Sequence, residues 1–394
     1  MQPRHHQGNT TPLVASLLLT AFASTGTSVI WNGLPFIGKR DFGFSEKETL
    51  SLFLLVGVVY VLGALCSGKI TRWLQTIIST RAIIGVLLLV QTIACSLPLF
   101  FEGAWVIWCA GGVAGACSSV LWPIVESYLV SGRHGKEMRR VIGWWNIVWM
   151  SSVAAVMFGM APMMQDHATM VIVVLGAMNI VAMCALPWYG KNPSSHDEEQ
   201  ILEHVPANYR SLLLGARMIL PLSYVMNGVL SPLLPFIVSG LDVPIFWQTP
   251  LVGAWMVSRV GITAIMGQFS GWHGKWSLLW GALLVMTIGF ACVLSASNVT
   301  VLLIGLILFG VGAGVTYYAS LYYAMSVGKA EVDAGGTHEA LIGGGYMVGP
   351  IVGLATIQMS NETQLQSFQP IIIVILVLLM LTIGALGLFT RKAR

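Results

Sequence analysis

The chain has 394 residues, of which 56% are hydrophobic and only 9% charged, with a formal net charge of +4 and a mean hydropathy of +0.79. Soluble domains carry about a quarter charged residues, so this composition excludes an ordinary soluble protein. In lipid the backbone must satisfy its own hydrogen bonds, and the long, non-alternating apolar runs are typical of membrane-spanning helices.

Twelve apolar runs follow one another along the chain, each of about the 20 residues that a membrane-spanning helix needs. They lie near residues 12–37, 48–68, 81–100, 104–131, 140–163, 168–188, 211–238, 247–271, 277–296, 299–327, 337–359 and 367–390. The first run resembles a secretory signal, because Arg4 precedes it and Ala21-Phe22-Ala23 follows the pattern of a cleavage site. The run continues to Ile37, however, so we predict a retained first helix.

The basic residues between the runs predict the orientation, because cytoplasmic loops are enriched in Lys and Arg. With the N-terminus inside, the cytoplasmic set is Arg4, Lys69, Arg72, Arg81, Arg133, Lys136, Arg139, Arg140, Lys191, Arg210, Arg217, Lys275, Lys329, Arg391, Lys392 and Arg394. The outer loops hold only Lys39, Arg40 and Lys47. We therefore predict that both termini are cytoplasmic, and the positive charge implies no nucleic-acid partner.

The cysteines and histidines do not form a metal or disulfide pattern. The six cysteines lie within the apolar runs, without metal-ligand spacing, and are Cys66, Cys95, Cys109, Cys117, Cys184 and Cys292. We expect them to be small packing residues, and we expect no metal and no cofactor.

Three short matches relate the two halves of the chain. The letters LPFI occur at residues 34–37 and 234–237, GGVAG at 111–115 is answered by GVGAG at 310–314, and Ser67-Gly68 is answered by Ser270-Gly271. Because the matches keep one order and nearly one offset, they indicate a duplicated unit of six helices. The longest polar stretch, 189–210, lies between the units, so we predict lobes at 1–188 and 211–394 joined by a cytoplasmic linker.

Two parallel six-helix halves joined by a polar linker resemble the major facilitator superfamily over the whole chain. The segment GYMVGPIVG at 345–353, which contains Gly349 and Pro350, fits the family pattern G-x-x-x-G-P-x-x-G. Its small residues favour close helix approach, and its proline permits a bend. The family's antiporters carry this pattern in the fifth helix, where this chain lacks it, so the resemblance does not imply antiport.

A second family signature, G-x-x-x-D-R-x-G-R after the second helix, is eroded at 63–72, where Ser67 occupies the acidic position. Gating through that acid is therefore not implied.

The resemblance implies an all-α membrane protein of two pseudo-symmetric six-helix bundles, working by alternating access as a monomer. We expect it to be a multi-pass protein of the plasma or inner membrane.

Arg259 lies near the middle of the eighth run, where an arginine costs on the order of 3 kcal/mol on insertion scales. Trp255, Arg259 and Thr263 share one helical stripe, so we expect this face to point inward. By resemblance to family members that bind carboxylates or inorganic anions, Arg259 would clamp an anion. The alternative is a structural arginine bonded to a neighbouring helix.

Glu126 lies near the inner end of the fourth run, followed by Arg139, Arg140 and Gly143 in an arrangement that resembles one common in the family. One interpretation is a proton carrier. The other, which its position favours, is an ion pair with Arg139 or Arg140 at an inner gate.

His338 and Glu339 follow Thr337, which we expect to cap the eleventh helix, with Glu339 favoured by the helix dipole. A proton relay is the less favoured alternative. We group both residues with the gating candidates, together with Gly349 and Pro350.

The family lines its cavity with the first, fourth, seventh and tenth helices. By that resemblance, the candidate substrate contacts besides Arg259 and Trp255 are Ser28, Asn32, Trp122, Tyr224, Asn227, Tyr318 and Tyr322. Each could equally form an interhelical hydrogen bond or pack as an aromatic residue.

Aromatic walls with one cation suit a small organic anion. The alternative substrate is a neutral or cationic solute such as a sugar or an amphiphilic drug, with Arg259 structural; coupling to protons stays open. A membrane enzyme would need clustered nucleophiles, bases or metal ligands. A channel would need a ring of like groups, so a transporter is the prediction.

Overall fold

The computed structural model describes residues 11–133, 135–193, 206, 208–327, 332–360 and 368–392. Within these residues, twelve helices are long and apolar enough to cross a membrane, which confirms the twelve predicted runs. The elements are α1 Leu13–Ser28, α2 Leu34–Phe42, α3 Glu46–Gln75, α4 Thr80–Ser96, α5 Trp105–Val130, α6 Gly135–Gly159, α7 Met163–Asp166, α8 Met170–Met183, α9 Asn208–Gly240, α10 Ile245–Gln268, α11 Trp276–Leu294, α12 Val299–Val327, α13 Val332–Ser360 and α14 Gln369–Lys392.

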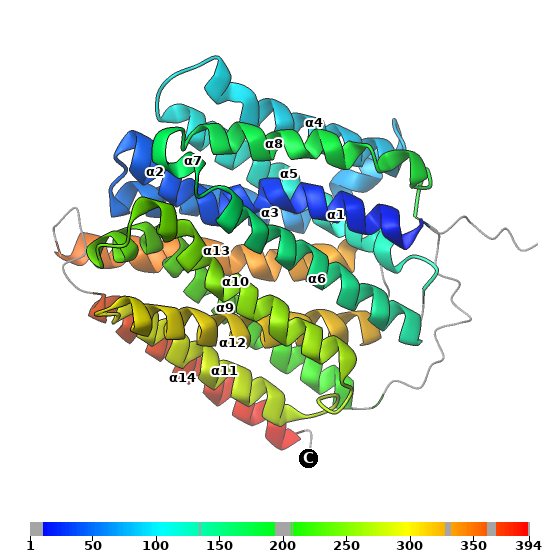
Figure 1. Ribbon diagram of the computed structural model, residues 1–394. Helices are drawn as coiled ribbons and strands as arrows, with labels where there is room; N and C mark the ends of the chain where they lie inside the picture. Colours follow the sequence, from blue (N-terminus) through cyan, green and yellow to red (C-terminus); the bar gives the residue numbers. More distant parts are fainter. Residues whose placement is uncertain are drawn as a thin grey trace, which may run out of the picture.

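The helices form two bundles (Figure 1). α4, α5 and α8 lie toward the top of the view and α11, α12 and α14 toward the bottom, with α6, α10 and α13 between them. α1 packs against α6 and α8 in the first bundle, and α12 packs against α10 and α11 in the second. The bundles meet mainly where α3 contacts α13 and where α6 contacts α10.

The first spanning helix contains a π-helical turn, Val29–Gly33, between α1 and α2. Proline has no N–H, so Pro35 cannot donate the i→i−4 bond to the carbonyl of Trp31. One residue earlier, the N–H of Leu34 bonds the carbonyl of Val29, five residues back, where an α-helix would use the carbonyl four residues back. Such π turns often mark functional sites, and this one holds Trp31 and Asn32, both buried.

The repeated glycine segments, 111–115 and 310–314, occupy equivalent helix contacts in the two bundles. In α5, a Cβ added at Gly115 would lie 3.0 Å from a side-chain carbon of Val56 in α3. In α12, a Cβ at Gly310 would lie 2.0 Å from the carbonyl oxygen of Trp255 in α10. The glycines therefore allow the fourth helix to approach the second, and the tenth to approach the eighth.

The GYMVGPIVG segment packs α13 closely against α9 within the second bundle. A Cβ added at Gly349 would lie 2.5 Å from the carbonyl oxygen of Val225 and 2.7 Å from the carbonyl carbon of Gly228. Pro350 follows inside α13, and a Cβ added at Gly228 would lie 3.2 Å from its Cδ. The expected role of these small residues in helix approach is thus visible in the packing.

The expected start of the eleventh helix is wrong. α13 begins at Val332, so Thr337 does not cap it, and His338 and Glu339 lie a turn or more inside the helix. Both side chains are buried, at 1% and 4% exposed. They therefore face the protein interior, and neither marks a helix terminus.

The first residues of the predicted linker pack on the first bundle. The side-chain oxygen of Asn192 accepts hydrogen bonds from the backbone N–H and hydroxyl of Thr80, at 3.1 and 2.7 Å. Residues 194–205 lie outside the described residues. We call the end of the molecule that carries Tyr189 and Asn208 the linker end, and the opposite end, which carries Lys39, the far end.

Candidate functional site

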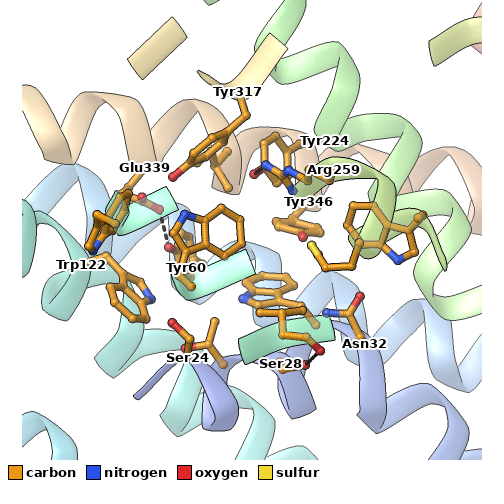
Figure 2. Close-up of a pocket in the computed structure, with 18 residues that line it drawn as sticks. Ser24, Ser28, Asn32, Tyr60, Trp122, Tyr224, Arg259, Tyr317, Glu339 and Tyr346 are labelled. Atoms are coloured by element: carbon orange, nitrogen blue, oxygen red, sulfur yellow. Dashed lines mark hydrogen bonds between the residues drawn. The ribbon is translucent and has the colours of Figure 1, made fainter. Parts of the chain in front are cut away.

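A cavity of about 80 Å³ lies between the two bundles (Figure 2). Its wall is mostly aromatic, and Arg259 and Glu339 are its only charged lining groups among the described residues. The lining residues are Ser24, Thr27, Ser28, Trp31, Asn32, Tyr60, Trp122, Trp145, Trp149, Val153, Tyr224, Trp255, Met256, Arg259, Tyr317, Glu339, Ile342 and Tyr346. Both bundles contribute, so relative movement of the bundles would change the shape of the cavity.

Arg259 is 3% exposed and lies among four aromatic rings. The centre of its guanidinium lies 4.7 Å from the ring centroid of Tyr317 and 4.9 Å from that of Trp149. The rings of Trp255 and Tyr224 are 5.8 and 5.9 Å away. These separations suit cation–π attraction, which strengthens when the cation is desolvated.

The guanidinium of Arg259 has few hydrogen bonds to the protein. Its Nη2 donates to the hydroxyl of Tyr224 at 3.1 Å, and its Nε has no hydrogen-bond partner among the described residues. A buried donor left unsatisfied costs about 1–3 kcal/mol. The arrangement therefore favours an acceptor that enters the cavity and takes the remaining N–H groups.

Glu339 is held across the interface between the bundles. The hydroxyl of Tyr60, on α3, donates a short hydrogen bond to Oε2 of Glu339, on α13 (Figure 2). Both side chains are buried, at 3% and 4% exposed. This bond ties the first bundle to the second at the wall of the cavity.

Glu126 is 2% exposed, and neither of its carboxylate oxygens has a hydrogen-bond partner among the described residues. Its Oε2 faces α13, where a Cβ added at Gly335 would lie 2.8 Å from it. The expected ion pair with Arg140 is therefore not formed; Arg140 is exposed and lines a separate groove. The side chain of Arg139 lies outside the described residues.

Trp31 and Tyr346 stack across the bundles, with ring centroids 3.8 Å apart and an interplanar angle of 16°. The hydroxyl of Tyr346 accepts a hydrogen bond of 2.8 Å from Nδ2 of Asn227, whose side-chain oxygen accepts from Ser231. Asn227 thus supports the cavity wall from behind and does not line the cavity.

The other predicted contacts divide between two places. Ser28, Asn32, Trp122, Tyr224, Trp255 and Arg259 line the cavity. The hydroxyl of Ser28 also donates to the carbonyl of Val153 at 3.3 Å, which is the interhelical bond left open as an alternative. Tyr318 and Tyr322 do not line the cavity; they lie in a groove at the linker end. The part that any of these residues plays in binding stays a prediction.

Sequence reasoning missed several lining residues, because it restricted the cavity to the family's usual lining helices and the arginine of the eighth. The second, fifth and eleventh helices contribute Tyr60, Trp149 and Tyr346. One signal was present in the sequence: Trp145 and Trp149 are four residues apart, so they share a helix face.

His338 is also buried. The centroid of its ring lies 5.3 Å from that of Tyr317, and neither of its ring nitrogens has a hydrogen-bond partner among the described residues.

A family model described as Major Facilitator Superfamily matches residues 16–335. The chain belongs to the major facilitator superfamily. It is a multi-pass membrane protein and a transporter, not an enzyme. No curated protein matches this superfamily member in sequence.

Two solved structures share the fold of this superfamily member. A mutant form of the nucleoside transporter NupG aligns with a TM-score of 0.68 and 11% identity, covering 97% of this chain and 99% of that one. The human organic anion transporter MFSD10 (TETRAN) aligns with a TM-score of 0.67 and 13% identity, covering 95% of this chain and 98% of that one. At such identities the likeness shows the fold alone.

Proposed function

We propose that this transporter carries a small organic anion, whose acidic group binds Arg259 in the central cavity. The observation that supports this most is the buried guanidinium, which among the described residues has one hydrogen bond, to Tyr224, and an Nε without a partner. The planar fork of an arginine matches a carboxylate or phosphate, and the bidentate bonds that result are roughly twice as strong as neutral ones.

The cavity wall supports an organic anion over a bare inorganic ion. Trp149, Trp255 and Tyr317 surround the guanidinium with large apolar faces that a ring or short chain could cover. A cavity of about 80 Å³ is smaller than the roughly 300–1,000 Å³ of typical ligand pockets. The bundles must therefore separate before such a substrate binds, as alternating access requires.

The proposed moving units are the lobes 1–188 and 211–394, joined by the linker 189–210. Two contacts cross between the lobes near the cavity, the hydrogen bond from Tyr60 to Glu339 and the stacking of Trp31 on Tyr346, and both would break and re-form as the lobes rock. The linker end would face the cytoplasm, in keeping with the distribution of basic residues.

Coupling to protons forms part of the proposal. Glu126 and Glu339 are buried carboxylates on opposite sides of the interface, and Glu126 packs beside Gly335, one turn before Glu339. Carboxyl groups at membrane depth commonly relay protons in transporters. Movement of α5 away from α13 would change the surroundings of both groups during the cycle.

The first test is a thermal-shift screen of the purified protein against small carboxylates, phosphate esters, sugars and cationic drugs. An anion should stabilise the parent, while Arg259→Gln should lose about 1.5–3 kcal/mol of binding free energy, the value of a hydrogen bond to a charged group. Arg259→Lys should recover only part, because it keeps the charge without the fork. Arg40→Gln, at an exposed arginine of the far end, is the control.

A second candidate function is transport of a neutral or cationic solute. The bond from Arg259 to Tyr224 and its four aromatic neighbours favour a structural arginine as well as a binding one. Neutral or cationic compounds that stabilise the parent and Arg259→Gln equally, with no stabilisation by anions, would favour this function and contradict the anion proposal.

A further inference from the structure

A second, larger hollow of about 550 Å³ lies at the linker end, between α6 of the first bundle and α10 and α12 of the second. α6 and α10 lie on the near face of the molecule in Figure 1 and contact each other along this interface. We call it the linker-end groove. Nothing in the proposed transport step uses it.

The polarity of the linker-end groove changes with depth. Arg140 is the first residue of one membrane span and Gln268 the last residue of another, and both line the groove at its outer end. Deeper in the same spans, the walls are formed by Trp144, Ile147 and Ala264. A cationic rim above an apolar wall follows the order of a phospholipid, with its phosphate at the membrane surface and its chains below.

The groove opens toward the surroundings of the protein. Trp144, one turn inside its span, is 48% exposed, and Phe269, directly after the end of the other span, is 66% exposed; both line the groove. In a protein embedded in lipid, such side chains meet the bilayer, and tryptophan is enriched where chains meet headgroups. The arginine side chain can reach the headgroup level while its stem stays on the apolar wall.

Tyr318 lies on the wall of this groove and does not line the central cavity. A Cβ added at Gly143 of α6 would lie 3.4 Å from the hydroxyl oxygen of Tyr318, and one added at Gly267 of α10 would lie 3.6 Å from it. The neighbouring residue, Tyr317, lines the central cavity. The buried Tyr318 thus lies where the two bundles meet, and the groove shares no lining residue with the central cavity, so a molecule in the groove is outside the proposed transport site.

We propose that the linker-end groove binds one anionic phospholipid, with its phosphate on Arg140 and an acyl chain between Trp144 and Ile147 of α6 and Ala264 of α10. Basic pockets between membrane helices bind anionic headgroups, and a guanidinium pairs well with a phosphate. Because the lipid contacts α6 of one bundle and α10 of the other, it stabilises the arrangement in which these helices are close. The lipid therefore regulates the rocking of the bundles, whatever the transported substrate is.

The test compares lipids on the purified full-length protein in detergent. Added phosphatidylglycerol should raise the thermal unfolding midpoint and remain bound as one molecule per protein in native mass spectra. Phosphatidylcholine, which lacks the net negative charge, and glycerol 3-phosphate, which lacks the chains, should do neither. Arg140→Gln should weaken retention of phosphatidylglycerol about tenfold, because the charge-assisted bond to phosphate is lost.

Two further variants separate a lost site from a damaged fold. Ala264→Phe fills the apolar part of the groove and should remove lipid retention while leaving Arg140 in place. Lys69→Gln, at an exposed lysine of α3 outside the groove, should change nothing. The midpoint measured without lipid shows whether each variant is folded. Unchanged phosphatidylglycerol binding by Arg140→Gln would overturn the proposal. Stabilisation by glycerol 3-phosphate through Arg140 would also overturn it, by making the groove a site for soluble anions.

Discussion

The ammonium group of Lys39 donates a hydrogen bond of 2.8 Å to the carbonyl oxygen of Pro235. The repeated LPFI segments are thereby joined to each other, since Lys39 follows the first copy and Pro235 belongs to the second. The same ammonium donates to the hydroxyl of Ser239 at 2.7 Å and lies 4.5 Å from the ring centroid of Phe236. This contact closes the far end of the interface between the bundles.

Lys39→Met should loosen the far end, because it removes two charge-assisted bonds. We expect a loss of about 1–2 kcal/mol, which changes the ratio of closed to open molecules by a factor of about 5–30. Spin labels at Lys47→Cys and Trp247→Cys, on opposite bundles, would report longer distances in a background without the exposed Cys66 and Cys184. Arg40→Met is a matched control, because Arg40 binds the carbonyl of Gln165 within the first bundle. Equal distances with and without Lys39 would contradict this role.

Gly349→Ala should destabilise the second bundle by about 1–3 kcal/mol, the usual cost of overpacking. Its Cβ would lie 2.5 Å from the carbonyl oxygen of Val225, and backbone cannot move aside as a flexible side chain can. Gly344→Ala, five positions earlier in the same helix, meets nothing within 4 Å and serves as the control. The thermal unfolding midpoints of the two variants decide the matter, and similar midpoints would disprove the close contact.

Arg133→Gln should destabilise the first bundle, because Arg133 binds the end of α5. Its Nη1 donates to the carbonyl of Leu129 and its Nη2 to that of Thr11, both at 2.6 Å. Loss of these charged bonds is expected to cost about 1.5–3 kcal/mol. Oε1 of Glu137 lies 3.7 Å from Nε of Arg133, but the side chain of Glu137 is 68% exposed. Glu137→Gln should therefore lower the free energy of unfolding by no more than about 1 kcal/mol. Thermal unfolding of both variants tests this order.

Glu339→Gln should abolish substrate accumulation driven by a pH gradient, while exchange of substrate across the membrane at equal concentrations continues. The amide keeps the size of the side chain but cannot carry a proton through the cycle. Tyr60→Phe should have a smaller effect in the same direction, because it removes only the hydrogen bond to Glu339. Transport into proteoliposomes with and without a gradient measures both. If Glu339→Gln accumulates substrate as the parent does, Glu339 carries no coupling proton.

The repeated sequence segments correspond to helix contacts within each bundle, but they did not predict the contacts between the bundles. The glycines at 111–115 and 310–314 predicted a duplicated unit, and in space they allow equivalent helix pairs to approach. The pattern could not predict that Lys39 would reach Pro235, because that bond joins the copies to each other and depends on how the bundles meet.

The sequence by itself determined the twelve helices and the inward position of Arg259, because both follow from the cost of placing polar groups in lipid. Only the tertiary structure decided which groups surround that arginine. Trp149 and Tyr317 come from helices far apart in the chain, and their approach depends on packing between the bundles. The same packing left Glu126 without Arg140 and placed Tyr318 on the wall of a groove outside the cavity. Helical periodicity fixes the face on which a residue lies, but the neighbour opposite that face is set by the contact of whole helices.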